Sequence, residues 1–127
     1  MRGGFHDKCF VCGRKHEKGL KLKFELSNNI IFGTFKIPKD YQGYEDILHG
    51  GIVAAILDSS MVNLFHLRDG LELKTVKISI RYKKQIPTEK EFNVSAYSLK
   101  TIRHIKVAKA QIKIDNTVYA EAEGFFA

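Results

Sequence analysis

The fold of this chain depends most on the stretch Leu48-His49-Gly50-Gly51-Ile52-Val53-Ala54-Ala55-Ile56-Leu57-Asp58. It begins with a His-Gly-Gly turn and then runs almost wholly apolar up to the aspartate, after which the apolar pattern resumes. A helix that is apolar on nearly every face is a buried helix. We therefore expect one long buried helix from about His49 to about His66, capped by Asp46 and ended by Arg68-Asp69-Gly70.

The carboxylate of Asp58 is the one charge in the middle of this helix. A buried charge is costly unless it is paired, hydrogen-bonded or used for chemistry. A helix places positions 54, 55, 61 and 62 beside it, and these hold Ala, Ala, Met and Val. Asp58 is therefore a candidate catalytic residue, two helical turns from Gly50 and Gly51. The alternative is a structural carboxylate held by backbone groups or water.

Strand patterns flank the helix on both sides. Residues 20–26 alternate apolar and charged residues with period two, and a Ser27-Asn28-Asn29 turn signal separates them from residues 31–37, which predicts a hairpin. After the helix we expect strands at residues 76–82, 92–97, 105–114 and 118–126, with a turn at Asp115-Asn116. The order predicts an α+β fold: one long buried helix wrapped by a five- or six-stranded antiparallel sheet.

Length and composition limit the class of protein. The 127 residues suit a single domain, residues 1–127, of which residues 1–19 form an N-terminal extension. We find no apolar run of about 18 residues, no signal-peptide pattern and only two cysteines, so we expect a cytoplasmic protein without a disulfide framework. The net charge of +7 fits a plain basic surface or a polyanionic partner, either nucleic acid or a phosphate-bearing small molecule such as coenzyme A.

The N-terminal extension carries residues that resemble metal ligands. His6, Cys9, Cys12 and His16 are spaced His-x2-Cys-x2-Cys-x3-His, and zinc prefers four such ligands. However, there is only one Cys-x2-Cys pair, whereas zinc sites usually draw on two. We therefore expect a structural turn here and no metal. A redox role is disfavoured as well, because no βαβ pattern surrounds the cysteines.

Four stretches, taken in order, resemble the hotdog-fold acyl-CoA thioesterases, most closely the phenylacetyl-CoA-type branch. The resemblance covers about Cys9 to Phe126. Its stretches are Cys9-Phe-Val-Cys-Gly with Gly19-Leu-Lys-Leu, Tyr41-Gln-Gly-Tyr44, His49-Gly-Gly to Asp58, and Val76 to Pro87.

The resemblance implies an activity, the hydrolysis of an acyl-CoA thioester without a cofactor. It gives Asp58 the role of general base or nucleophile, and Thr75 that of a hydroxyl that positions the water. The N–H of Gly50 would donate to the thioester carbonyl, which suits the free N–H groups of a helix start, and Gly51 would allow close approach. His49 would shape the turn. The resemblance also implies a homodimer, or a dimer of dimers (homotetramer), with the site at the subunit interface.

Two departures from the related enzymes concern substrate binding. Gly43 stands where many have an Asn, and Gln42 beside it is a candidate substitute; Ser59 stands where many have a second acid. Arg81, Lys83 and Lys84 are candidates for the phosphates of coenzyme A, the alternative being a solvated strand face. Other candidates for the same contacts are Lys100, Arg103, Lys106 and Lys109.

Other functions remain open at this point. The departures at Gly43 and Ser59 fit a non-catalytic module that binds acyl-CoA or CoA. A nucleic-acid binder would use the positive charge, but the chain lacks the aromatic stacking motifs of RNA-binding sheets. A hydratase would need an Asp and His pair that we do not find. We expect no specific nucleic acid and no membrane as partners, and an acyl pocket shaped by Phe35, Leu64, Phe65 and the partner subunit.

Overall fold

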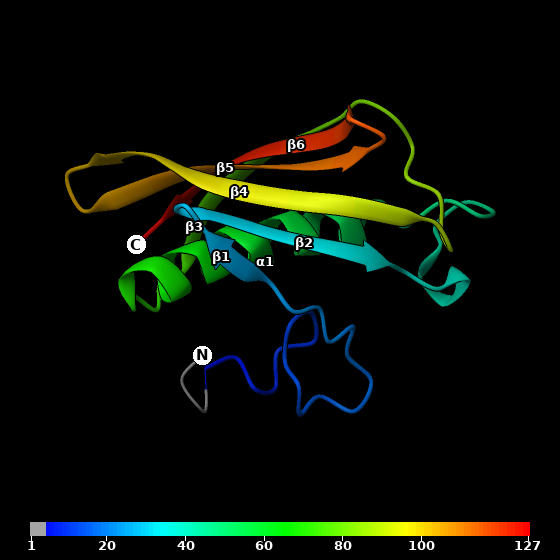
Figure 1. Cartoon of the computed structure of the whole chain (residues 1–127), viewed down its shortest axis with the longest axis horizontal. Coiled ribbons are helices and arrows are strands. Elements are labelled where there is room, and N and C mark those ends of the chain that lie inside the picture. Colours follow the sequence, from blue (N-terminus) through cyan, green and yellow to red (C-terminus); the bar gives the residue numbers. More distant parts are fainter. Residues whose placement is uncertain (1–4) are drawn as a thin grey trace.

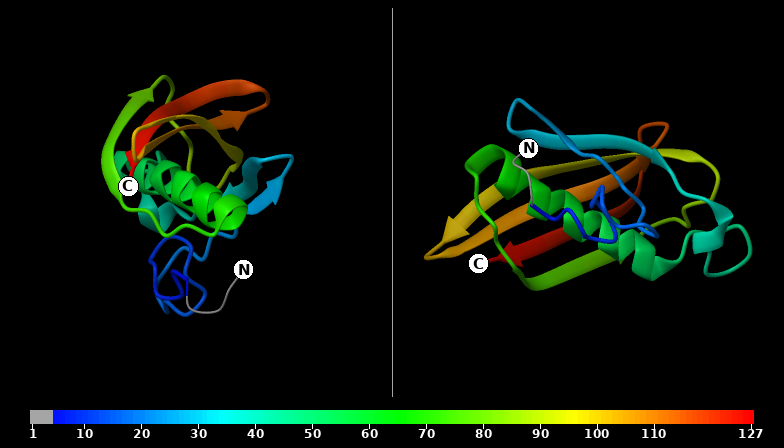
Figure 2. Two further views of the ribbon diagram at one scale, coloured as in Figure 1. Left: turned by 90° about the vertical axis from the view of Figure 1, so that its left-hand side faces the viewer. Right: turned by 90° about the horizontal axis from the view of Figure 1, so that it is seen from below.

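A computed structural model describes residues 5–127 and has one helix and a sheet of six antiparallel strands (Figure 1). The strands are β1 (Glu25–Ser27), β2 (Ile30–Lys36), β3 (Thr75–Tyr82), β4 (Glu91–Ile102), β5 (Ile105–Ile114) and β6 (Thr117–Phe126). The helix is α1 (Gly50–Asp69), and a short 3-10 turn covers Lys39–Tyr41. The sheet order is β1-β2-β4-β5-β6-β3, and the sheet curls around α1 (Figure 2). The expected α+β architecture with six strands is confirmed.

Helix α1 is the core of the molecule. Its side chains Ile56, Leu57, Met61, Leu64 and Phe65 are fully buried against the inner face of the sheet. By length and composition alone α1 could also cross a membrane, a test that the core helix of a globular protein passes too, and most of it is buried inside this fold.

The ends of α1 have clear physical causes. At its start the ring of His49 caps the helix, since Nδ1 accepts from the Gly51 N–H at 2.8 Å. The expected cap, Asp46, is wrong: it lies in the preceding loop, four residues before the helix begins, so its side chain is not the one that meets the free N–H groups. At the other end Gly70 adopts φ +71°, the left-handed conformation that glycine tolerates, and its N–H bonds to the His66 carbonyl.

Both expected hairpin turns are present. Asn28 and Asn29 have φ of 52° and 64°, and Asp115 and Asn116 have φ of 49° and 65°. Two successive residues with positive φ form a turn whose twist matches that of the flanking strands, and Asn and Asp tolerate this conformation best.

The first expected strand is mostly wrong. Only Glu25–Ser27 pairs with β2, although the alternation holds in burial, since Leu22 and Phe24 are buried. The backbone of residues 20–22 bonds to the N-terminal segment instead: the N–H groups of Leu20 and Leu22 donate to the carbonyls of Phe10 and Val11. The described part of the segment before β1, residues 5–24, thus lies on the side of α1 away from the sheet (Figures 1 and 2).

Strand β3 forms one edge of the sheet and pairs only with β6 within the described chain. Its apolar face is incompletely covered: Ile78 and Ile80 are half-buried, whereas Val76 is 60% and Tyr82 53% exposed. An unpaired edge with exposed apolar side chains is a template for pairing with another strand.

Candidate functional site

The first turn of α1 offers a free backbone donor. The Gly51 N–H is used by His49, and the N–H groups of Ile52 and Val53 bond to the His49 carbonyl. Among residues 5–127 no acceptor is found for the N–H of Gly50. This donor lies at the positive end of the helix dipole, where an oxyanion is stabilised. The structure therefore keeps Gly50 available for the role that the resemblance implies.

Tyr82 fixes the position of this donor. Its hydroxyl, at the end of β3, donates to the Gly50 carbonyl at 2.8 Å. The contact joins the start of α1 to the edge strand and holds the Gly50–Gly51 peptide, which follows the peptide that carries the free N–H. The sequence predicts only that Tyr82 ends a strand, and nothing in the sequence indicates that its hydroxyl reaches a residue 32 positions away.

A cavity of about 330 Å³ opens at the same place. It lies between the loop before α1, the helix start and the chain after β3, and most of its lining is apolar. Its walls include Gly43, Tyr44, His49, Gly50, Tyr82 and Lys84. A largely apolar cavity with a few polar groups at its mouth is the usual form of a small-molecule site.

Asp58 lies in a second place, near the other end of β3. Its side chain is half-buried, and the hydroxyl of Thr75 donates to its Oδ1 at 2.6 Å. Asp58 and Thr75, two of the residues that the resemblance implies for the site, are therefore in direct contact. Because Thr75 donates its only proton to Asp58, its oxygen lone pairs are left to accept a hydrogen bond, for example from a water molecule.

The two places are too far apart to act on one bond. Gly50 and Asp58 are eight residues apart on one helix, and at about 1.5 Å per residue this separates them by about 12 Å along the axis. A reacting carbonyl must be within about 3 Å of both its oxyanion donor and the attacking group. Within a single chain, Gly50 and Asp58 form two half-sites.

The loop before the helix contributes little polarity to the cavity. Gln42 uses its side-chain oxygen to accept from the Asp46 N–H at 2.9 Å and so holds the loop. Gly43 does line the cavity, where an added Cβ would come within 3.4 Å of the His49 Cα. Ser59, which follows Asp58, is buried. Of the residues expected to shape an acyl pocket, Leu64 and Phe65 are fully buried in the core.

The three basic residues at and just after the end of β3 line two different hollows. Lys83 and Lys84 line the cavity at the helix start, with Lys84 Nζ 5.7 Å from the centre of the Tyr119 ring and Lys83 Nζ 3.5 Å from Glu121 Oε1. Arg81 lines a different hollow, on the outer face of the sheet.

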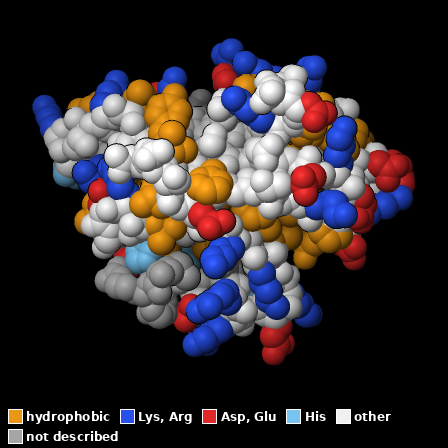
Figure 3. All heavy atoms as spheres, viewed as in Figure 1, with side chains coloured by type: hydrophobic (Ala, Val, Ile, Leu, Met, Phe, Trp, Pro, Cys, Tyr) orange, Lys and Arg blue, Asp and Glu red, His pale blue; other side chains and the backbone are white. Residues whose placement is uncertain are grey.

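One face of the molecule shows how basic side chains are distributed over it. On the face drawn in Figure 3 they stand in separate groups with acidic side chains among them. A nucleic-acid interface usually gathers Lys and Arg into one patch or stripe. This face therefore gives no support to a nucleic-acid partner.

The two cysteines lie half-buried against α1. Burial raises the pKa of the Cys12 thiol to about 11, an effect that a hydrogen bond with the Asn63 side chain reduces. A thiol with such a pKa is protonated at neutral pH, which disfavours a reactive redox cysteine at this position.

Comparisons with known proteins give a fold. No protein-family model and no curated protein matches the chain. A solved thioesterase-superfamily protein superposes on 93% of this chain with a TM-score of 0.83 at 23% identity, and the chain spans 62% of its length.

Two further structures superpose over most of both chains. The phenylacetic acid degradation protein PaaI of Thermus thermophilus matches with a TM-score of 0.73 at 15% identity, over 83% of this chain and 90% of that one. A Streptococcus mutans protein bound to acetyl-CoA matches with a TM-score of 0.74 at 18% identity, over 87% and 92%. The helix wrapped by a six-stranded antiparallel sheet, together with the superposition on these three structures, shows that this chain has the hotdog fold.

Proposed function

We propose that this chain hydrolyses an acyl-CoA thioester to the free acid and CoA, in a site that two copies of the chain build together. The observation that carries the proposal is the pair Thr75–Asp58, joined at 2.6 Å, with the unpaired N–H of Gly50 about two helical turns away. A base with a water-positioning hydroxyl and an oxyanion donor are the parts that ester-type hydrolysis requires.

A second copy can bring the two half-sites together. Thr75 begins β3 and Tyr82, which holds Gly50, ends it. In a two-fold antiparallel pairing of β3 with β3, the start of each strand faces the end of the other. Asp58 and Thr75 of one copy would then face Gly50 of the second, and the pairing would cover the exposed Val76 and Tyr82.

The reaction follows from these groups. A water molecule donates a hydrogen bond to the Thr75 oxygen and gives its other proton to the Asp58 carboxylate. At the same time the water oxygen attacks the thioester carbonyl carbon. The developing oxyanion accepts from the Gly50 N–H of the second copy. The carbon–sulfur bond then breaks, and the CoA thiolate takes the proton from Asp58 as the acid is released, which returns Asp58 to its carboxylate form. Direct attack by Asp58 is the alternative route, through an acid anhydride that water hydrolyses.

Coenzyme A is the proposed carrier of the acyl group for two reasons. Lys83 and Lys84 line the cavity next to Gly50 and suit a phosphate-bearing ligand. The Streptococcus mutans structure with the same fold was determined with acetyl-CoA bound. Arg81 would contribute from the outer face of the sheet only if the ligand reached around the strand edge.

A non-catalytic CoA-binding module is the second candidate. The loop before α1 supports this candidate. The side-chain oxygen of Gln42 already accepts from the Asp46 N–H, and Gly43 has no side chain that could bind the thioester carbonyl. Such a protein would bind CoA in the same cavity without turnover.

The test is thiol release from short, medium, long and aromatic acyl-CoAs by wild type and Asp58→Asn, with CoA binding measured calorimetrically for both. We expect wild type to cleave at least one class and the variant to lose about a hundredfold or more in kcat while retaining CoA affinity. Equal cleavage by both proteins would contradict the mechanism. CoA binding without cleavage by wild type would favour the binding module.

A further inference from the structure

The segment before β1 is unusual for its length. Residues 5–24 form turns and extended pieces without a helix or strand. A segment that precedes the first element of a domain is usually well ordered only where something ties it down. Apolar contacts hold part of it, since Phe5 and Val11 are buried.

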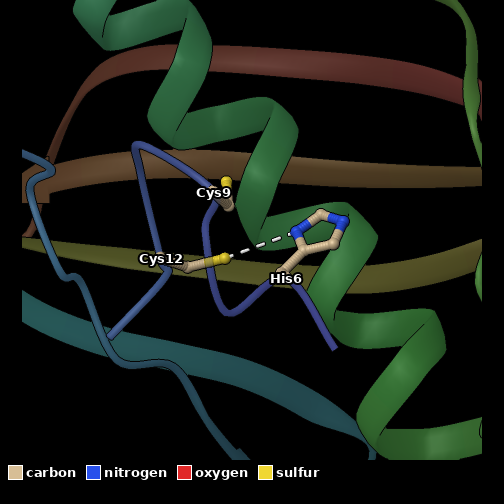
Figure 4. A group of neighbouring side chains, drawn as sticks. All are labelled: His6, Cys9 and Cys12. Carbon is tan, nitrogen blue, oxygen red and sulfur yellow. Dashed lines mark hydrogen bonds between the residues drawn. The ribbon is translucent and has the colours of Figure 1, made fainter. Parts of the chain in front are cut away.

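Three side chains of this segment converge on one point. The ligand atoms of His6, Cys9 and Cys12 all lie within 4.8 Å of one another. Figure 4 shows them on one short loop beside α1, with the Cys12 sulfur directed at the His6 ring. The Cys12 Sγ and His6 Nδ1 atoms are 3.5 Å apart.

We propose that His6, Cys9 and Cys12 bind one Zn²⁺ ion through His6 Nδ1 and the two sulfurs. Zinc binds sulfur at about 2.3 Å and histidine nitrogen at about 2.0–2.1 Å in a tetrahedron, so a sulfur and a nitrogen on one ion are about 3.5 Å apart. The observed separation of 3.5 Å between Cys12 Sγ and His6 Nδ1 equals this edge, and the remaining separations, all within 4.8 Å, would contract when the ion binds. The fourth position is left to water.

The backbone around the cluster is arranged to hold the ligands in place. The Gly13 N–H bonds to the Cys9 carbonyl at 2.8 Å, and the Cys9 N–H bonds to the His6 carbonyl at 2.9 Å. An added Cβ at Gly13 would lie 2.4 Å from the Asp7 carbonyl oxygen, so the turn that joins the two cysteines to His6 requires glycine.

Ring stacking ties His6 to the helix. The His6 ring stacks on Phe5 at 4.2 Å between centroids, and Phe5 stacks in turn on His66 of α1 at 3.5 Å. The stack fixes the plane of the His6 ring, as contacts around a ligand do in metal sites. The ion would hold the turn of residues 6–12 closed, and the ring stack joins that turn to α1.

His16 provides a matched control. It lies four residues after Cys12, and its Nδ1 accepts from the Lys18 N–H at 3.2 Å. It is not part of the cluster of ligand atoms that the described residues form. A His16→Asn variant therefore removes an imidazole of the same segment while sparing the proposed ligands.

The experiment uses untagged, reduced full-length chain, stripped by a chelator and titrated with Co²⁺ as a spectroscopic probe for zinc. For wild type and His16→Asn we expect one ion per chain, a thiolate-to-cobalt charge-transfer band and the visible bands of tetrahedral cobalt. Cys12→Ser and His6→Asn should weaken binding at least tenfold, and zinc should raise the Tm of wild type more than that of either variant.

Three outcomes of this titration would contradict the proposed zinc site. Absence of the charge-transfer band in reduced wild type would overturn the proposal, as would cobalt binding that Cys12→Ser leaves unchanged. Loss of binding in His16→Asn equal to that in Cys12→Ser would overturn the assignment of the ligands. If Cys12→Ser fails to fold, Cys9→Ser and His6→Asn provide the same comparison. None of these readouts depends on thioester cleavage.

Discussion

The hydroxyl of Thr75 donates to Oδ1 of Asp58 at 2.6 Å and so joins the first residue of the edge strand to the middle of the core helix. The contact orients the carboxylate and leaves the Thr75 oxygen able to accept from a water. It links the half-buried acid to the strand edge at which a second copy is proposed to pair.

Replacing Thr75 tests this contact. Thr75→Val keeps the shape of the side chain and removes the hydroxyl, and we expect kcat to fall about ten- to a hundredfold, since a hydrogen bond to a charged group is worth about 1.5–3 kcal/mol. Thr75→Ser should restore most of kcat. A Val variant with the wild-type kcat would show that the hydroxyl does not position the water.

The cap of α1 can be tested through stability. His49→Ala removes the acceptor for the Gly51 N–H, and we expect the free energy of unfolding to fall by about 1 kcal/mol. His49→Asn supplies another capping acceptor and should lose less. Urea denaturation of the three proteins measures the difference, and an alanine variant as stable as wild type would mean that the cap contributes nothing.

The basic residues at the cavity can be tested through the substrate. Lys84→Gln should raise KM for an acyl-CoA several-fold and leave unchanged the KM for an acyl-pantetheine, which carries no phosphate. Lys36→Gln, an exposed position on β2, is the control of equal charge change. An equal rise in KM for both substrates would indicate that Lys84 shapes the cavity and does not contact phosphate.

The sequence predicted the elements that depend on local signals. The run from Gly50 onward predicted the buried helix, and Asn28-Asn29 and Asp115-Asn116 predicted the two hairpin turns. It failed for residues 20–24 because their alternation reflects burial alone, while their backbone bonds to residues 10 and 11. The sequence around residues 10 and 11 has no strand pattern, so nothing in it indicates this pairing.

The candidate site was only partly predictable for the same reason. Asp58 stands out because a charge interrupts an apolar helix, a pattern visible in the sequence alone. The contact of Tyr82 with Gly50 and the use of Gln42 by the loop depend on how distant segments meet. The metal-ligand spacing was visible, but His6, Cys9 and Cys12 converge only through the fold of the N-terminal turn.

A proline at position 50 would remove the N–H donor of Gly50 while keeping the helix. Proline is tolerated at the first position of a helix, where it lacks only the N–H, and His49 has the extended ψ of 134° that a residue before proline needs. We expect Gly50→Pro to lower kcat about a hundred- to a thousandfold. Gly50→Ala keeps the N–H, and its Cβ would lie 3.8 Å from the Tyr82 ring, an ordinary contact. Its kcat should stay within a few-fold of wild type.

Mixing two inactive proteins tests the central claim, that one site uses Asp58 and Gly50 from different copies. Asp58→Asn and Gly50→Pro are unfolded together in equal amounts and refolded. A mixed dimer holds one site with both groups intact. Random pairing makes half of the dimers mixed, so the account predicts recovery of about a quarter of the wild-type thioesterase activity. If mass spectrometry shows mixed dimers and the activity is no higher than that of the separate variants, the shared site is contradicted.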